Sequence, residues 1–276
     1  MLIDELTTEQ QAILLASILA DGEITKCYPG SRRKNNSYRE HFGENQRFYR
    51  EWKQQALPEL LYIRTKNLVS KSLPLFTELF PHYYPLDKKT IPFDLLTRCT
   101  HPLFLLVLYL DDGSLMISKR LNQKNQLYVT PSIALYLQSF PKDVLVTFSE
   151  WLNETFDVKF RLSGIPSGHG HFLKTTKVED TLSFLKKMKC YIAELPDFAY
   201  KLDWETRLEA IQSDFPHSTL ITSLPARPYT EQECNFLTRL KQQGLTDQEI
   251  ATTLGRSYWS VVYKLRQLKK AMDRSP

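Results

Sequence analysis

The chain has 276 residues, of which 42% are hydrophobic and 24% charged, and its formal net charge is +5. This is the composition of a globular protein with room for one large and one small domain. Its apolar runs are too short to cross a bilayer, and the first nine residues carry acids and no base, unlike a signal peptide. We therefore expect an intracellular protein without a membrane partner, whose scattered cysteines are reduced thiols: Cys27, Cys99, Cys190 and Cys234.

The positive charge is unevenly distributed. Residues 227–276 hold nine Lys or Arg against five Asp or Glu, and residues 26–53 hold eight bases against three acids. Basic stretches of this kind suit a polyanion such as DNA. For any one stretch alone, solvated surface charge is the alternative interpretation.

The first hundred residues alternate helical and strand-like patterns. A helix begins at Thr7, which has Gln10 in capping-box spacing, and runs to about Ala20. After it we predict two strands around a polar loop, a helix, short extended pieces and a second helix, at 22–28, 38–45, 46–57, 60–70 and 73–84.

The same order recurs after a second oily helix at 102–111. We predict strands, a helix, a strand pair and a last helix at 114–118, 127–138, 142–156, 159–164, 171–176 and 178–192. In both series of elements, a similar number of residues separates the aspartate that follows the apolar helix from a tyrosine in a later strand. We therefore predict a degenerate tandem repeat in a domain over 1–214, with repeats of about 1–100 and 101–214.

The C-terminal part has a different pattern. Residues 215–227 contain prolines and no periodicity, which predicts a linker. Three short helices are expected at 230–243, 246–255 and 257–271, with Gly244 and Gly255 as stops and Val261, Leu265 and Leu268 as core positions. Short helices joined by a tight turn to a basic third helix indicate a helix-turn-helix domain over 228–276.

Both apolar helices are followed directly by Asp-Gly, in LLASILADG at 14–22 and LLVLYLDDG at 105–113. Since neither helix has a polar face, we expect them to pack together and bring Asp21 close to Asp112. Two carboxylates at two negative helix ends repel each other, and a hard divalent cation with oxygen ligands removes the conflict. This pattern indicates a metal site.

The two stretches resemble the signature helices of LAGLIDADG homing endonucleases in their single-chain, two-motif form. DKKTIP at 87–92 and LPDFAYKLD at 195–203 resemble two further segments of that family, which carry active-site lysines, here Lys89 and Lys201. Leu106 and Val107 depart from the small residues of the signature, which predicts a looser helix contact. The tail, from RPYTEQE to SYWSVVYKLRQL, resembles Myb/SANT-like helix-turn-helix modules.

The resemblance implies an α+β fold: tandem pseudo-symmetric αββαββα repeats that form a DNA-binding saddle, followed by a small all-α three-helix domain. It implies a site-specific homing endonuclease that makes double-strand breaks with short 3′ overhangs in a long DNA target. Asp21 and Asp112 would hold Mg²⁺, with Mn²⁺ as the expected substitute, and Lys89 and Lys201 would stabilise the transition state or polarise water. We expect a structural role for Asp111, whose helix register differs from that of Asp21, while Glu23 and Ser114 are minor candidates for positioning water or metal.

Polar loops and strands then become candidates for DNA contact, because their side chains can bind phosphates or purine edges. The predicted DNA-binding residues of the large domain are Lys26, Arg32, Arg33, Lys34, Asn35, Tyr38, Arg39, Arg64, Lys66, Lys119, Arg120, Asn122, Gln123, Lys124, Gln126, Arg161 and Lys174. Those of the tail are Arg256, Ser257, Ser260, Tyr263, Lys264 and Arg266.

Two other functions stay open on the same scaffold. One is an intron-splicing maturase with intron RNA as partner, and the other is a non-cleaving DNA-binding regulator, which retention of both aspartates and both lysines disfavours. The partner expected first is double-stranded DNA, bound by a monomer in the cytoplasm or nucleoid of a prokaryote or in an organelle matrix. The termini lack intein-splicing residues, so we expect a free-standing or intron-encoded protein.

Overall fold

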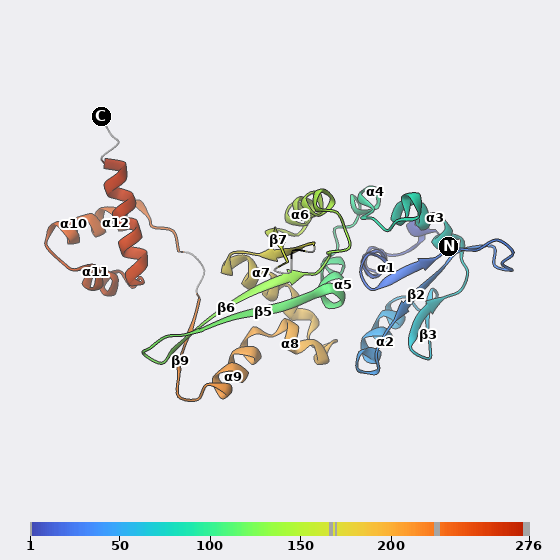
Figure 1. Ribbon diagram of the computed structural model, residues 1–276, viewed down its shortest axis with the longest axis horizontal. Coiled ribbons are helices and arrows are strands. Elements are labelled where there is room, and N and C mark those ends of the chain that lie inside the picture. The colour runs from blue at the N-terminus through green and yellow to red at the C-terminus, as the bar shows by residue number, and fades with distance from the viewer. Residues whose placement is uncertain (1, 166–167, 169, 224–226, 273–276) are drawn as a thin grey trace. The chain divides into compact units, whose positions relative to one another are not determined.

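The computed structural model describes residues 2–165, 168, 170–223 and 227–272. The chain divides into two compact units, residues 1–225 and residues 226–276, which are described separately (Figure 1). Among the described residues, no helix is long and apolar enough to span a membrane.

The first unit contains two sets of elements in the same order. The first half consists of a helix, a strand pair, a second helix, a second strand pair and a third helix. These elements are α1 (Thr8–Leu19), β1 (Gly22–Thr25), β2 (Ser37–His41), α2 (Arg47–Ala56), β3 (Leu61–Arg64), β4 (Asn67–Ser70) and α3 (Pro74–Tyr83). After the short α4 (Phe93–Leu96), the second half repeats them: α5 (Pro102–Asp112), β5 (Gly113–Leu121), β6 (Gln126–Leu135), α6 (Lys142–Phe156), β7 (Phe160–Gly164), β8 (His171–Thr175) and α7 (Val178–Met188).

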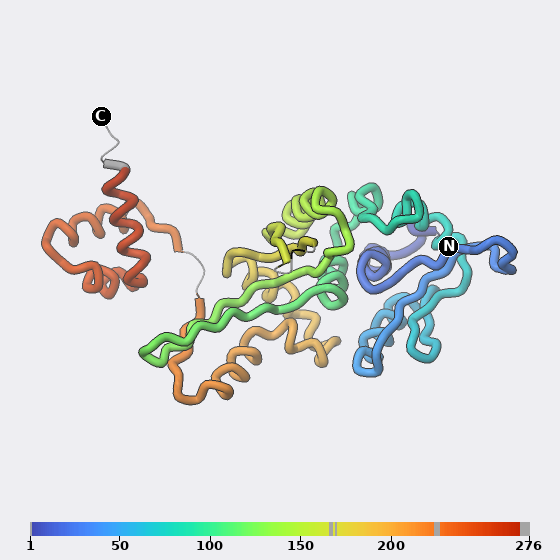
Figure 2. The backbone as a smooth tube through the Cα atoms, in the orientation of Figure 1, coloured from blue at the N-terminus to red at the C-terminus, as the bar shows by residue number. Residues whose placement is uncertain are grey.

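The two sheets have the same topology, which confirms the tandem repeat. The strand order is β1-β2-β4-β3 in the first half and β5-β6-β8-β7 in the second, and neighbouring strands along each order are antiparallel. Figure 2 follows the backbone through the first sheet and then through the longer β5–β6 hairpin of the second. The fold class is therefore the α+β architecture expected from the sequence.

The two motif helices, α1 and α5, pack against each other in the core of the unit. Residues 12–19 of α1 and 103–110 of α5 are buried on every face. A helix that is apolar all round must be covered on all sides, and the opposite motif helix supplies part of that cover. Ala12 and Ala16, both fully buried, leave room for the close approach. Leu106 and Val107 are also fully buried, so the larger residues of the second signature are accommodated.

The segment that precedes the tail differs from the prediction. Two helices, α8 (Ala199–Leu202) and α9 (Trp204–Asp214), follow α7. Thr219–Thr222, inside the predicted linker, forms strand β9 and pairs in parallel with residues 126–129 of β6. Its β-branched residues suit a strand, and the edge of the long hairpin offers unpaired backbone groups that the sequence pattern could not reveal.

The second unit contains the three expected helices, α10 (Glu231–Gln242), α11 (Asp247–Leu254) and α12 (Tyr258–Met272). Capping boxes begin the first two helices, at Thr230 with Glu233 and at Thr246 with Glu249, and left-handed Gly255 (φ +59°) ends α11. The core of the unit holds Leu237, Leu240, Ile250, Ala251 and Val261, with Leu265 and Leu268 packed against it. The predicted core positions are confirmed, while DNA binding by this unit stays a prediction.

Candidate active site

Asp21 and Asp112 lie where the two motif helices end. Asp21 comes one residue after the C-cap of α1, and Asp112 is the last residue of α5. Burial raises the pKa of Asp112 to about 6, and the neighbouring Asp21 carboxylate contributes to the rise while Lys89 and Lys201 oppose it. The two aspartates are thus near enough to interact electrostatically, as the packing argument from sequence requires.

The glycine after each aspartate is required by close packing. A Cβ atom on Gly22 would lie 2.5 Å from Cε2 of Tyr38, and one on Gly113 would overlap the ring and backbone of Tyr109. Since neither glycine has a positive φ in the structure, steric space and not backbone conformation demands glycine at both places. The two Asp-Gly ends therefore combine a charged group with a residue that lets the first strand of each sheet turn tightly off its helix.

The two predicted lysines also lie at the helix ends. The ammonium group of Lys89 donates to the carbonyl oxygens of Ala20 (3.0 Å) and Gly22 (2.9 Å), and that of Lys201 donates to Leu110 O (2.8 Å). Each lysine therefore serves the motif helix of its own half, where unpaired carbonyls and the helix dipole attract a cation. Burial lowers the pKa of both lysines, and the nearby aspartates oppose that shift.

Sequence analysis missed three charged residues that contact this centre. Arg50 Nη2 lies 2.7 Å from Asp21 Oδ2 and 2.7 Å from Glu40 Oε1. Lys53 Nζ lies 2.9 Å from Glu40 Oε1 and 2.8 Å from Asp111 Oδ2. The side chains of Glu40, Lys53 and Asp111 are fully buried, so these are ion pairs within the protein interior.

Part of this network could have been found in the sequence. Tyr38 and Glu40 are two apart on β2 and both point inward, as strand alternation requires, and the Tyr38 hydroxyl donates to Glu40 (2.5 Å). Arg50 and Lys53 are three apart on one face of α2, and both cations lie over the Tyr49 ring, at 5.0 and 4.7 Å from its centroid. Lys53 and Arg50 hold the pKa of Glu40 below its ordinary value even though burial raises it.

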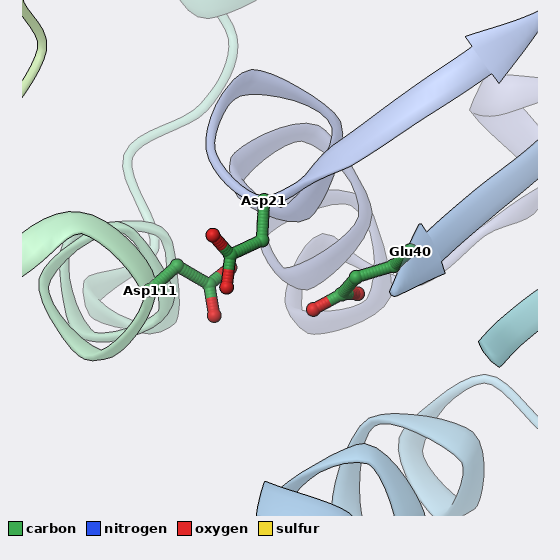
Figure 3. Close-up of side chains that lie close together, drawn as sticks. All are labelled: Asp21, Glu40 and Asp111. Atoms are coloured by element: carbon green, nitrogen blue, oxygen red, sulfur yellow. The ribbon is translucent and has the colours of Figure 1, made fainter. Parts of the chain in front are cut away.

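Asp111, for which a structural role is predicted, also lies beside the candidate site. One of its oxygens lies within 4.8 Å of one from Asp21 and one from Glu40. Figure 3 shows the three side chains directed toward a shared space, Asp21 from just after the end of α1, Glu40 from β2 and Asp111 from α5. Burial raises the pKa of Asp111 to about 7 against the attraction of Lys53. The ion pair with Lys53 gives Asp111 a structural role as well, because it joins the two halves.

The donor set fits a hard divalent cation. Asp21 and Asp112 offer carboxylate oxygens, which are ligands that Mg²⁺ accepts, whereas the carbonyls of Ala20, Gly22 and Leu110 already accept hydrogen bonds from Lys89 and Lys201. Burial and like charge already disfavour the ionised form of Asp112, and a bound cation would relieve both effects.

Most of the predicted DNA contacts are accessible. Those exposed are Lys26, Arg32, Lys34, Arg39, Arg64, Lys66, Lys119, Arg120, Gln123, Lys124, Arg161, Ser257, Tyr263 and Arg266. Those partly exposed are Arg33, Asn35, Asn122, Gln126, Lys174, Ser260 and Lys264. A groove on the first sheet is lined by Thr25, Ser37, Arg39, Tyr62, Arg64 and Lys71, among others. The minor candidates lie nearby: Glu23 is paired with Arg39, and Ser114 is partly exposed at the start of β5.

Two predicted DNA contacts are placed differently. Tyr38 is 1% exposed and directed at Glu40, so the strand alternation sends it into the core. The guanidinium of Arg256 is 5% exposed, lies 2.8 Å from Glu233 and stacks at 3.9 Å over the ring of Tyr229. It therefore ties the start of the second unit to its helices and is not presented to a groove.

The second unit also exposes aromatic residues beside the one that was predicted. Trp259 is 60% and Tyr263 63% exposed on α12, with ring centroids 6.1 Å apart. Tyr258 adds a second contact, 5.2 Å from the Trp259 ring. Sequence analysis selected Tyr263 but not Trp259 as a candidate DNA contact.

Comparison with known proteins shows similarity over most of the first unit. The "Protein RecA" of Mycobacterium shimoidei is 25% identical over 204 residues, covering 71% of this chain, which spans only 47% of that relative. The solved homing endonuclease I-WcaI, bound to its DNA recognition sequence, is 21% identical with a TM-score of 0.55, over 71% of this chain and 87% of that one. The model of the LAGLIDADG DNA endonuclease family matches residues 11–179, more than half of the sequence, and the chain therefore belongs to that family.

Proposed function

We propose that this protein is a site-specific homing endonuclease that makes magnesium-dependent double-strand breaks in a long DNA target. The observation that carries the proposal is the convergence of Asp21, Asp112, Lys89 and Lys201 at the ends of two packed helices. Each half of the first unit contributes one aspartate and one lysine, so each can serve one strand of a duplex.

The protein groups have separate roles in this proposal. Asp21 and Asp112 would hold Mg²⁺, or Mn²⁺ in its place, which when bound supplies an activated water and neutralises developing charge. Lys89 and Lys201 would stabilise the anionic transition state at the scissile phosphates, and the hydrogen bonds of their ammonium groups to carbonyls at the ends of the two motif helices support this role. Their lowered pKa values make each lysine a better proton donor than a free lysine.

The DNA would bind along the exposed polar faces of the two sheets. Arg39 and Arg64 in the first sheet and Arg120 and Arg161 in the second are exposed on strands, where side chains can reach phosphates and base edges. Since one chain supplies both halves of the centre, we expect a monomer to act on the duplex. The second unit would lengthen the footprint through α12, with weak and salt-dependent contacts of its own.

The test is cleavage of a duplex library by the purified full chain in Mg²⁺, followed by sequencing of the cut ends. We expect a defined target, with Asp21→Asn and Asp112→Asn each abolishing double-strand cleavage while binding of that target is retained. Each substitution removes a metal ligand and no base contact. Cleavage by either variant at nearly the wild-type rate would contradict the assignment of the aspartates.

The same experiment distinguishes the other candidate functions. A regulator on this scaffold would bind one duplex from the library and cut none, and a maturase would prefer a structured intron RNA over every duplex. Because a homing endonuclease must reach DNA, we expect the protein to work in a nucleoid-containing cytoplasm or an organelle matrix.

A further inference from the structure

The two halves of the centre are chemically unequal, as the sheet register reveals. Gly22 pairs with Glu40 across β1 and β2, and Gly113 pairs with Leu135 across β5 and β6. Glu40 in the first half therefore corresponds to Leu135 in the second. A buried carboxylate in one half is replaced by a fully buried aliphatic side chain in the other.

The helices that follow show the same inequality. The dipeptide Glu-Trp occurs at 51–52 in α2 and at 150–151 in α6, which aligns Arg50 with Ser149 and Lys53 with Leu152. Ser149 donates to the carbonyl of Phe160 (2.9 Å), and Leu152 is fully buried in the core. The guanidinium and ammonium groups of the first half thus have no charged counterpart in the second.

The aspartates consequently have different partners. Asp21 is held by Arg50, whose side chain is 1% exposed and is also anchored by Glu40. Among the described residues, no cation lies within 4.0 Å of the Asp112 carboxylate. Lys89 and Lys201 interact with Asp112 only at longer range, and their ammonium groups donate hydrogen bonds to backbone carbonyls instead.

We propose that Arg50 competes with the divalent cation for Asp21, so that the Asp112 side is loaded first and the two strands are cut in a fixed order. This rests on the proposed endonuclease function. A guanidinium 2.7 Å from Oδ2 occupies one of the two oxygens that the Asp21 carboxylate could offer a cation, and it would repel that cation at short range. Arg50 is a positioning residue that acts through Asp21 and sets the inequality of the half-sites.

The test uses Mn²⁺ alone and the full chain, with binding followed by loss of the free Mn²⁺ signal in electron paramagnetic resonance. The Asp21-dependent part of binding is defined by comparison with Asp21→Asn, and the Asp112-dependent part by comparison with Asp112→Asn. Arg50→Ser, which installs the residue of the second half, should tighten the Asp21-dependent part by about tenfold or more, since a like charge leaves a partly buried site.

Three controls isolate the effect. The double variant Asp21→Asn/Arg50→Ser should lose the gain, Arg50→Lys should retain weak binding because a cation remains, and Ser149→Ala should change neither part. If Arg50 only supported the fold, its removal would weaken Mn²⁺ binding. Unchanged or weaker Asp21-dependent binding in folded Arg50→Ser overturns the proposal; if that variant does not fold, Arg50→Met, which still covers the Tyr49 ring, is measured and judged by the same outcome.

A second readout separates this inference from the endonuclease proposal. On a cleaved target, the wild-type chain should accumulate a nick in one strand, and Arg50→Ser should bring the two strand rates together. If the chain cuts no DNA, the endonuclease proposal fails, whereas the Mn²⁺ titration still decides the competition at Asp21. Equal strand rates in an active wild-type chain would contradict the fixed order alone.

Discussion

Replacing Lys53 by leucine, the residue that the second half has at this place, tests whether the buried ion pairs stabilise the contact between the halves. The substitution leaves Asp111 without its cation and Glu40 with Arg50 only. Removing one partner of a fully buried ion pair costs about 3–5 kcal/mol, because the remaining charge stays desolvated. We expect a loss of that size in the free energy of unfolding of the first unit near pH 8.

The loss should depend on pH. Burial raises the pKa of Asp111 to about 7 although Lys53 lowers it, so removing Lys53 raises the pKa further. In the unfolded chain the group titrates at about 3.9, so the folded variant binds its proton more tightly. Below the unfolded pKa both states are protonated and the destabilisation is smallest. Up to about pH 7 the folded wild-type and variant chains both keep the Asp111 proton, so the destabilisation changes little. It grows as the pH rises above about 7, where the wild-type carboxylate ionises against Lys53 and the variant must either retain a proton or bury a bare carboxylate.

Calorimetric unfolding of the full chain from pH 5 to 8 measures this effect. The double variant Lys53→Leu/Asp111→Asn should recover much of the stability near pH 8 and lose the pH dependence, because no charge is left unpaired at that position. Arg47→Leu breaks the exposed pair with Glu51 (3.0 Å) and should cost less than about 0.5 kcal/mol. If Lys53→Leu is no more destabilising than Arg47→Leu at pH 8, the buried pair does not stabilise the fold as reasoned here.

Three further predictions follow from the site and the tail. Lys89→Met and Lys201→Met should each slow cleavage severely and unequally for the two strands, since each lysine serves one half; normal strand rates in both would contradict their assignment. Gly113→Ala should destabilise the first unit by about 1–3 kcal/mol, because its Cβ would overlap Tyr109, and an unchanged unfolding midpoint would contradict the packing argument. A chain that ends at Ser223 should still cut its core target but bind a long target more weakly, with a shallower salt dependence. Footprints of equal length for this chain and the full chain would count against a DNA-binding tail.

Several features follow from local sequence patterns alone. The capping boxes at Thr7, Thr230 and Thr246 form as the sequence indicates, because they depend on residues three apart. The two motif helices are buried because they have no polar face, and their Asp-Gly ends follow from the residues themselves. Similar element order then indicated two halves of one fold, which the two sheets confirm.

Other features depend on how distant elements meet. Strand alternation puts Glu40 and Tyr38 on one face of β2, but only the ion pair of Glu40 with Lys53 from α2 shows that this polar face is the buried one. The helix-turn-helix pattern predicts an accessible Arg256. In the structure this side chain is covered by Tyr229 and Glu233, which lie more than twenty residues earlier in the chain. Strand β9 exists because the edge of β6 is available to it.

The sequence by itself therefore determined the repeat, through the order of its elements, and the two buried helices with their terminal aspartates, through composition and spacing, whereas Lys89 and Lys201 were implied by the family resemblance. Only the tertiary structure decided which charges neutralise those groups. Asp111 forms an ion pair with Lys53, which lies 58 positions earlier in the sequence. Asp21 forms an ion pair with Arg50, which lies 29 positions later. In a poorly solvated interior, a charged group interacts with whichever opposite charge lies nearest in space. A local sequence pattern does not show which residues those are.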